Sequence, residues 1–311
     1  MSGPPRLFDR SLLRTRLDRA ARSISAAGFL RARAAEDAVD RLSAILRDFP
    51  LAAELGARDS AFARALVGTP AAKRVGALIE ADLSEAMLRS NPSAASPLRL
   101  VADEERLPFA PASLDLVVSL LSLHWVNDLP GAFLNIRNAL KPDGLFLGSF
   151  FGGATLTELR QVLIAAEAEL VGGAGLRVSP FADGPDAAGL LQRAGFTLPV
   201  VDLDRVTVRY DHPLKLMADL RAMGETNALV DRARNPLSRA VLARASELYA
   251  ERFVGPDGKV PATFELITVT GWAPHPSQQQ PLKPGSAKMR LADALGVKEH
   301  RLRGDEENQP L

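Results

Sequence analysis

The chain has 311 residues, of which 47% are hydrophobic and 24% charged, with a formal net charge of +1. This length can bury the core of one large α/β domain, and the balanced charge gives no general attraction to nucleic acid or an anionic membrane. The absence of cysteine excludes disulfides, cysteine-bound metal sites and a thiol nucleophile. The longest apolar runs, such as residues 114–123, are shorter than the ~20 residues that cross a bilayer. We expect a cytoplasmic protein with no transmembrane segment, no nucleic-acid partner and at most a peripheral membrane association through a partner.

Residues 1–40 predict an N-terminal helical segment. Arginine is frequent among alanine, leucine and serine there, a composition also typical of mitochondrial transit peptides. Transit peptides are poor in acids, whereas Asp9 and Asp18 interrupt this stretch. Leu7, Leu13 and Leu17 recur near the helical period, which favours a basic amphipathic helix of the mature fold.

Residues 41–150 alternate between short apolar runs and helix-patterned segments, which predicts a doubly wound sheet with right-handed crossovers. Residues 141–144, Lys-Pro-Asp-Gly, predict a tight turn before the fifth strand. The expected strands are 51–55, 75–80, 98–101, 114–119 and 145–150, and the expected helices are 61–66, 84–89 and 131–140.

The second half of the chain predicts two further helices, at 156–170 and 186–193, and two closing strands, at 200–210 and 264–272. A helical insertion at about 214–252 separates the two strands. Residues 274–284 are rich in proline and glutamine, and residues 304–311 are polar and acidic. We therefore expect one domain over residues 41–272 and an extended C-terminal tail over 273–311.

The first predicted strand ends in Glu54-Leu55-Gly56, a pattern typical of the turn that approaches the phosphates or ribose of a nucleotide-type ligand. Glycine suits such a turn because it tolerates positive φ and lets the backbone come close to the ligand. Here Arg58 and Ser60 follow Gly56 instead of further glycines. The turn is therefore present in a degenerate form.

Acidic residues follow the next two predicted strands. Asp82 stands about 25 residues beyond Gly56, a spacing similar to that of the acid that binds ribose hydroxyls in dinucleotide folds. Asp103 and Glu104 follow the third strand, where a carboxylate could accept a hydrogen bond from an exocyclic amine. Each acid alone would equally suit a helix cap. Their placement at successive strand ends predicts a nucleoside ligand.

These features resemble the class I S-adenosylmethionine-dependent methyltransferases. The matching segments follow in order along the chain: residues 54–56, Asp82-Leu83-Ser84, Asp103 with 107–109, 116–119 ending in Ser119, and 141–144. A nearer resemblance is to the mitochondrial complex I assembly factor 5 group and its bacterial relatives. It rests on residues 7–10, 119–130, 151–153, 219–227 and 260–272, so it spans nearly the whole chain from Leu7 to about Leu295.

The resemblance implies a Rossmann-like α/β fold of the class I methyltransferase type with S-adenosylmethionine as cofactor. It places Gly56 at the first turn, Asp82 on the ribose and Asp103 near adenine, with residues 122–125 over cofactor and substrate. Arg58, which stands where family members have glycine, either pairs with the methionine carboxylate or fills the site and ends cofactor binding. The cofactor-binding residues implied are Glu54, Gly56, Arg58, Asp82, Leu83, Asp103, Glu104 and Ser119.

The resemblance leaves the reaction open, because fold does not fix chemistry. Methyl transfer would need little more than alignment of a nucleophile, with His124 as a candidate base or an ordered structural histidine. The mitochondrial member is regarded as hydroxylating an arginine of a complex I subunit. A hydroxylase iron site would use two histidines and a carboxylate, and no histidine pair here stands at helical metal spacing. We expect no metal site.

Residues 223–227, Met-Gly-Glu-Thr-Asn, interrupt a helical pattern and are our candidate for the substrate side. Glu225 could hold the guanidinium of an arginine-bearing partner, with Trp125 and Asn227 as further substrate-binding candidates. Glu225 is also a catalytic candidate. The alternative is structural, namely a helix that ends at Gly224 and a second helix capped by Asn227.

The sequence thus predicts an S-adenosylmethionine-dependent methyltransferase-like enzyme that acts on, or assists, a respiratory complex I subunit during assembly. Three alternatives stay open: a non-catalytic assembly chaperone with a degenerate cofactor loop, an arginine hydroxylase, and a methyltransferase for a small or carrier-linked acid.

Overall fold

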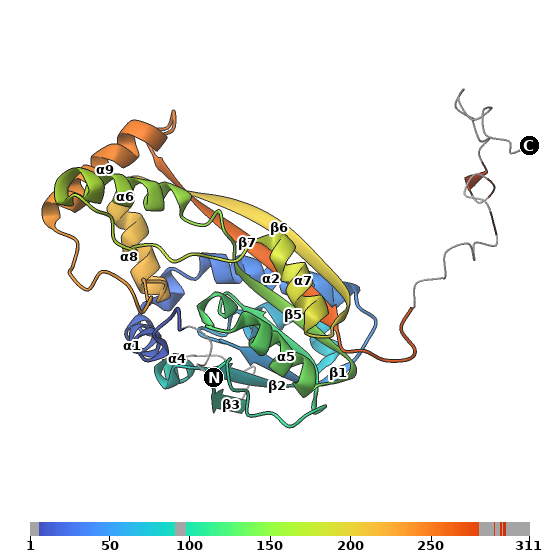
Figure 1. The fold of residues 1–311 in the computed structure, drawn as a ribbon. Coiled ribbons are helices and arrows are strands. Elements are labelled where there is room, and N and C mark those ends of the chain that lie inside the picture. The colour runs from blue at the N-terminus through green and yellow to red at the C-terminus, as the bar shows by residue number, and fades with distance from the viewer. Residues whose placement is uncertain (1–5, 91–97, 280–288, 290–292, 294, 297–311) are drawn as a thin grey trace, which may run out of the picture. The chain divides into compact units, whose positions relative to one another are not determined.

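Seven strands form one sheet in the order β3-β2-β1-β4-β5-β7-β6 (Figure 1). The first five strands in the chain pair in parallel, whereas β7 is antiparallel to both β5 and β6. The predicted α/β doubly wound fold of the class I methyltransferase type is therefore confirmed. The strands are β1 Phe49–Leu55, β2 Val75–Asp82, β3 Leu98–Val101, β4 Leu114–Leu120, β5 Leu140–Phe151, β6 Thr197–Tyr210 and β7 Val260–Trp272.

The structure is a computed structural model that describes residues 6–90, 98–279, 289, 293, 295 and 296. Residues up to His275 belong to one compact unit, and residues from Pro276 onward to a second. In the second unit the described residues 276–278 form a turn and a bend. The predicted polar tail at 304–311 lies outside the described residues.

Helices cover both faces of the sheet. Helices α2 Phe29–Ala44 and α3 Ala61–Leu66 bury their apolar side chains in one core with α6 Thr157–Val171, whereas α5 Leu129–Ala139 and α7 Gly184–Arg193 pack in a second core on the other face. Figure 1 shows α5 and α7 in front of the sheet and α2 behind it. Leu116 faces the first core and Val117 the second, as expected when successive side chains of a buried strand point to opposite faces.

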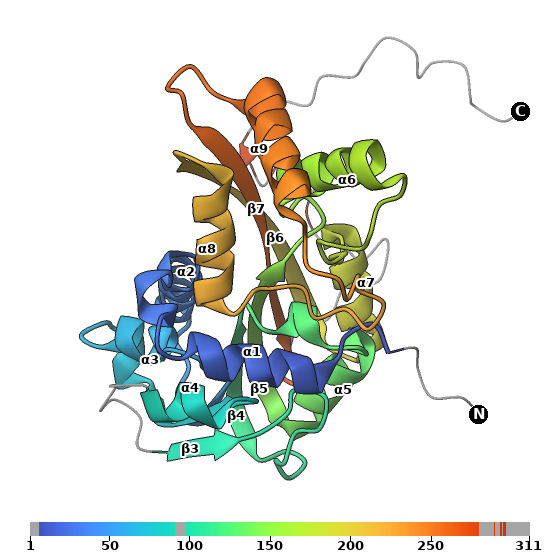
Figure 2. The ribbon, with the colours of Figure 1, turned by 90° about the vertical axis from the view of Figure 1, so that its left-hand side faces the viewer.

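The N-terminal helix α1, Arg10–Ala20, crosses the end of the sheet beside α4 Glu85–Ser90 and α8 Pro213–Met223 (Figure 2). It begins at Asp9, whose carboxylate accepts a hydrogen bond from the amide of Leu12 at 3.0 Å. Leu13 and Leu17 on its inner side are buried with Trp125 in a small separate core. The amphipathic pattern thus attaches this helix to the site end of the sheet.

The chain between β6 and β7 forms two helices, α8 and α9 Arg239–Phe253, joined by a long loop. Helix α9 packs against α6, and both bury side chains in the core to which α2 also contributes. Loop residues 225–238 run back toward α1, where Val230 donates a backbone hydrogen bond to Leu7 at 2.9 Å. The insertion and the N-terminal segment therefore meet at one end of the molecule's first unit.

The turn predicted before the fifth strand, at residues 141–144, lies inside β5, which already begins at Leu140. These residues form a bulge inside β5, because Leu140 already pairs with Leu114 and Leu145 pairs with Leu116. Asp143 takes the left-handed conformation, with φ of 65°, and Lys141 forms an ion pair with Asp115 at 2.9 Å. Asp143 and Gly144 keep the turn-like backbone that the sequence indicates, but pairing with β4 and Ala273 keeps them in the sheet.

Candidate functional site

The carboxyl ends of β1, β2 and β4 bring most of the predicted cofactor residues together. Glu54, Asp82 and Ser119 end or nearly end these three neighbouring strands, and all three are at most 1% exposed. The Ser119 hydroxyl donates to the carbonyl of Leu55 at 3.1 Å. Leu83 turns away from the others and packs in the small core under α1. The parallel sheet thus forms the predicted cluster, but as a closed one.

The turn after β1 keeps the backbone of a glycine loop, although Arg58 and Ser60 stand where further glycines would follow Gly56. Gly56 has a φ of 69°, Arg58 of 49° and Ser60 of 56°. The left-handed region costs a residue with a side chain roughly 1 kcal/mol or more, so Arg58 and Ser60 are strained there. A Cβ on Gly56 would overlap the side chain of Ser122. The turn is therefore packed directly against the loop that follows β4.

Arg58 is buried against the acid that was expected to bind ribose. Its side chain is 2% exposed, and its Nε lies 3.6 Å from an Asp82 carboxylate oxygen that also accepts the Arg58 backbone amide at 3.0 Å. The other Asp82 oxygen accepts the amide of Ser84 at 2.7 Å. Burial raises the pKa of Asp82, and the charge of Glu104 adds to this, while Arg58 opposes it.

Arg10 from α1 contacts both acids that were expected near adenine. Its guanidinium donates to Asp103 at 2.6 Å and to Glu104, which also accepts the hydroxyl of Ser122. Burial alone would raise the pKa of Glu104, but Arg10 and then Ser122 hold that pKa below its usual range. Arg10 also donates to the carbonyl of Trp125 at 3.3 Å. Both acids are therefore already paired within the chain.

Glu54 is the one predicted cofactor residue whose carboxylate accepts no hydrogen bond from a described residue. Its partner charge is Arg31 of α2, at 3.7 Å, which also pairs with Asp59 at 3.1 Å and donates to the carbonyls of Gly56 and Ala57. Burial raises the pKa of Glu54 well above its usual range, although Arg31 opposes this.

As they stand, these residues do not fit S-adenosylmethionine. Arg58 already pairs with Asp82, where the ribose hydroxyls would donate. Arg10 pairs with Asp103 and Glu104, and the side chain of Ser122 packs directly against Gly56. Sequence reasoning missed Arg10 and Arg31. Arg10 lies in the motif at residues 7–10, which could have pointed to it, whereas no sequence signal pointed to Arg31.

The two catalytic candidates, His124 and Glu225, contact each other. A Glu225 carboxylate oxygen lies 2.9 Å from His124 Nε2 and accepts the indole N–H of Trp125 at 2.8 Å. Burial would raise the pKa of Glu225, but His124, Arg58 and Trp125 together hold it below its usual range. His124 also packs on the ring of Phe151, with centroids 4.7 Å apart. Glu225 thus has two hydrogen-bond partners within the chain, His124 and Trp125.

Residues 223–227 have a structural role that sequence reasoning left open. Helix α8 ends at Gly224, whose φ is 81°, and the amide of Glu225 donates back to the carbonyl of Leu220 at 2.8 Å. Asn227 does not cap the next helix, because α9 begins only at Arg239. Its side chain donates to the carbonyl of Leu176 and accepts the amide of Leu229, so both of its functional groups have partners.

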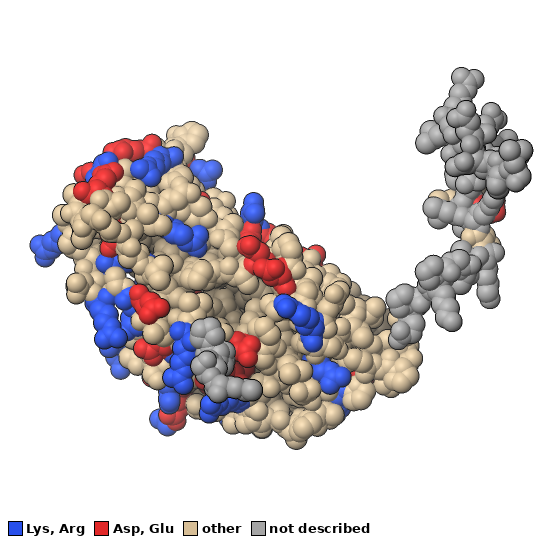
Figure 3. Space-filling model, in the orientation of Figure 1, with Lys and Arg blue, Asp and Glu red and all other residues tan. Residues whose placement is uncertain are grey.

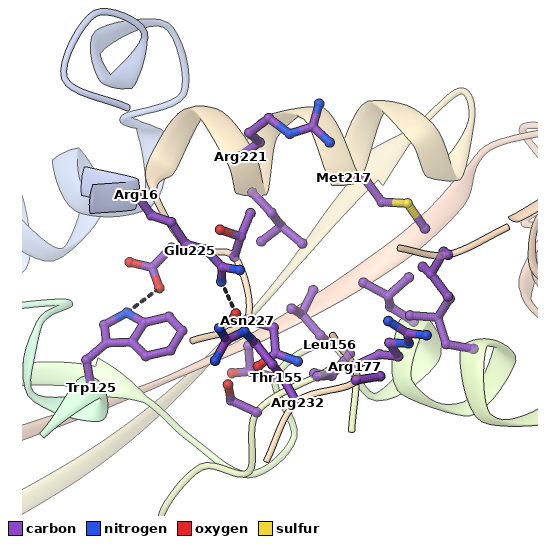
Figure 4. Close-up of a pocket in the computed structure, with 18 of the residues that line it drawn as sticks. Arg16, Trp125, Thr155, Leu156, Arg177, Met217, Arg221, Glu225, Asn227 and Arg232 are labelled. Carbon is purple, nitrogen blue, oxygen red and sulfur yellow. Dashed lines mark hydrogen bonds between the residues drawn. The ribbon is translucent and has the colours of Figure 1, made fainter. Parts of the chain in front are cut away.

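A cavity of about 670 Å³ lies on the outer side of Glu225. Figure 4 shows Trp125, Glu225 and Asn227 along its wall, together with Arg16 from α1 and Met217 from α8. The three predicted substrate residues therefore border one space. Gly56, Arg58, Asp82 and Asp103 do not line it.

Within the part of the chain that the structure describes, no group of three or more histidine, aspartate and glutamate side chains is arranged to hold a metal ion. The same residues include no helix that is both long and apolar enough to span a membrane.

Comparisons with known proteins agree with this fold. A methyltransferase-domain family matches residues 54–148. The arginine-hydroxylase NDUFAF5, mitochondrial, of Danio rerio is 41% identical over 92% of this chain and 89% of its own length. A malonyl-[acyl-carrier protein] O-methyltransferase of Methylovorus is 34% identical over 88% of this chain and 92% of its own length.

Among solved structures, the YcgJ protein of Bacillus subtilis superimposes with a TM-score of 0.53 at 15% identity, over 78% of this chain and 99% of that protein. At that identity the likeness concerns the fold alone. The two relatives compared by sequence cover 92% and 88% of this chain. The chain therefore belongs to the NDUFAF5 family of methyltransferase-domain proteins.

Proposed function

We propose that this protein assists the assembly of respiratory complex I by binding one of its subunits, and that it does so without S-adenosylmethionine. The buried Arg58–Asp82 pair carries the second part of this proposal, because it occupies the acid on which ribose binding depends. The resemblance to the complex I assembly factor 5 group supports the first part. We further propose a cytoplasmic location, with any membrane contact made through the partner.

Titration calorimetry with S-adenosylmethionine and S-adenosylhomocysteine tests the cofactor part. We expect no saturable heat from the wild type, because Arg58 pairs with Asp82, and Arg10 pairs with Asp103 and Glu104. Arg58→Gly/Ser60→Gly restores glycines at two strained positions and removes the competing charge, so it is the variant in which binding would reappear. Saturable binding by the wild type that Asp103→Asn abolishes would overturn the proposal.

The partner part is tested in cells. Deletion of the gene in its host should lower the amount of assembled complex I on native gels. We expect full rescue by the wild type and equal rescue by Asp103→Asn, which alters an acid that the cofactor would need while Arg10 keeps its contact with Glu104. A normal level of complex I after deletion would contradict the assembly role, whatever the outcome of the calorimetry.

Arginine hydroxylation of the bound subunit is a second candidate, favoured by the names of relatives that are 40–41% identical to this chain. Mass spectrometry of the captured subunit distinguishes the candidates. A gain of one oxygen atom on an arginine that depends on this protein favours hydroxylation. A gain of a methyl group would show that cofactor chemistry is retained.

A further inference from the structure

The cavity outside Glu225 has a strongly basic rim. Among the described residues, the side chains that line it include six arginines and a single acid, Glu225, which already contacts His124 and accepts a hydrogen bond from Trp125. In Figure 3 basic side chains gather at the end of the molecule where Figure 1 places α1. The arginines are Arg16, Arg19, Arg177, Arg221, Arg232 and Arg234.

Internal carboxylates leave most of this positive charge unmatched. Arg177 pairs with Glu167 at 2.6 Å, and Arg232 has Asp9 at 3.9 Å. Within the described ranges, Arg16 donates to the carbonyl of Asn227 but pairs with no carboxylate. Burial lowers the pKa of Arg16, and repulsion by Arg232 and Arg19 lowers it further. The arginines at this rim therefore repel one another, and an anion placed between them would relieve that repulsion.

The floor of the same cavity is apolar and reaches the core. Phe151, Leu159 and Phe264 line it, and each is at most 4% exposed. They come from β5, α6 and β7, and Met217 of α8 also lines the cavity. A volume of about 670 Å³ lies within the usual range for small-molecule sites. The cavity is partly open to solvent, and an apolar floor beside a basic rim suits an amphipathic ligand.

We propose that this cavity binds an amphipathic anion, with a carboxylate or phosphate head group at the arginine rim and an acyl chain on the apolar floor. The head group lies beside Arg16 and Arg232, whose side chains converge near Asn227 in Figure 4. The same charge distribution disfavours a free arginine side chain in this space. The acids at the strand ends do not line this cavity, so the proposal does not depend on whether S-adenosylmethionine binds.

Calorimetry on the full chain with laurate, dodecanol and dodecylamine tests the proposal, because the three ligands share a chain and differ in head group. We expect saturable binding of laurate, at least ten-fold weaker binding of dodecanol, and none of dodecylamine. Laurate affinity should fall as salt rises, since the head group is held by charge. Equal binding of all three ligands, or no binding of laurate and of dodecyl phosphate, would overturn the proposal.

Variants of this cavity distinguish binding of the head group by the rim arginines from binding of the chain in the apolar space. Arg16→Gln/Arg232→Gln should weaken laurate about ten-fold or more, since charge-assisted hydrogen bonds are lost, whereas Arg14→Gln, an exposed change on α1 outside the lining, should not. Met217→Trp fills the cavity without changing charge and should abolish binding. It also keeps the test decisive if the double variant does not fold. Unchanged affinity in Met217→Trp would place laurate elsewhere and overturn the proposal.

Flotation of the protein with phosphatidylglycerol vesicles tests whether the anion is a soluble molecule or a membrane lipid. Binding to monomeric laurate or dodecyl phosphate without flotation supports a soluble acid or phosphate ester. Flotation that laurate competes away supports a lipid drawn from a membrane. Flotation that laurate does not compete, or a response to an acidic peptide and to none of the single-chain anions, would contradict a cavity site.

Discussion

At the scale of single residues, the site depends on Arg58, because it stands at a position of glycine-like backbone and fills the space beside Asp82. Loss of one partner of a buried ion pair typically costs about 3 kcal/mol, since the remaining charge stays buried without compensation. We expect Arg58→Met to lower the free energy of unfolding by about that amount. Asp82→Asn added to it should restore part of the loss. Urea denaturation of the single and double variants measures both, and an unchanged single variant would contradict the pairing.

The buried carboxyl group of Glu54 should make the free energy of unfolding depend on pH. Burial raises its pKa in the folded protein, so the folded state binds this proton more tightly than the unfolded state. The contribution of Glu54 to stability is therefore most favourable below its unfolded pKa of about 4.3 and declines as pH rises toward the folded pKa. Glu54→Gln removes this decline.

Denaturation at pH 5 and pH 8 tests this effect. The free energy of unfolding of Glu54→Gln, relative to that of the wild type, should be about 1 kcal/mol higher at pH 8 than at pH 5. This is the lower end of the cost of a buried polar group without a partner. Glu36→Gln, which changes an exposed acid on α2, is the control and should show no such gain. If Glu54→Gln were more stable than the wild type only at pH 5, this would contradict a raised pKa of Glu54.

At the scale of elements, α1 is held on the sheet by the contacts of Arg10 with Asp103, Glu104 and the carbonyl of Trp125. Arg10→Met should loosen the helix while the sheet stays folded, since helices that lose their anchoring contacts open locally at lower free energy. We expect amide exchange in α1 to accelerate at least ten-fold, with β4 and β5 unchanged. Arg14→Met, exposed on the same helix, is the control. Equal acceleration in both variants would assign the effect to the helix rather than to its anchor.

At the scale of the whole molecule, one class I methyltransferase fold carries two neighbouring sites with different electrostatics. The acids at the strand ends are neutralised by Arg10, Arg31 and Arg58, whereas the outer cavity keeps an excess of arginine. Sharing a fold with methyltransferases therefore does not transfer their chemistry. Helix α1 contributes to both sites, with Arg10 to the acids and Arg16 to the cavity, so it is the element through which either site could influence the other.

The sequence by itself determined the strand and helix order, because the alternation of apolar runs with helical periods is a local property. It also determined the acids at the strand ends, since parallel strands bring their carboxyl ends to one edge. It located the degenerate turn at Arg58 but left two roles for that arginine open. It placed the turn at residues 141–144 before the fifth strand, whereas the pairing of Leu140 with Leu114 of β4 makes that strand begin before the turn.

The tertiary structure alone decided what the acids contact. Arg10 and Arg31 come from helices far away in sequence, so no local pattern links them to Asp103 or Glu54. It also decided that Glu225 is bound by His124 and Trp125, about 100 residues earlier in the chain. Charge at a site is a sum over residues from many elements, and that sum exists only once the chain has folded.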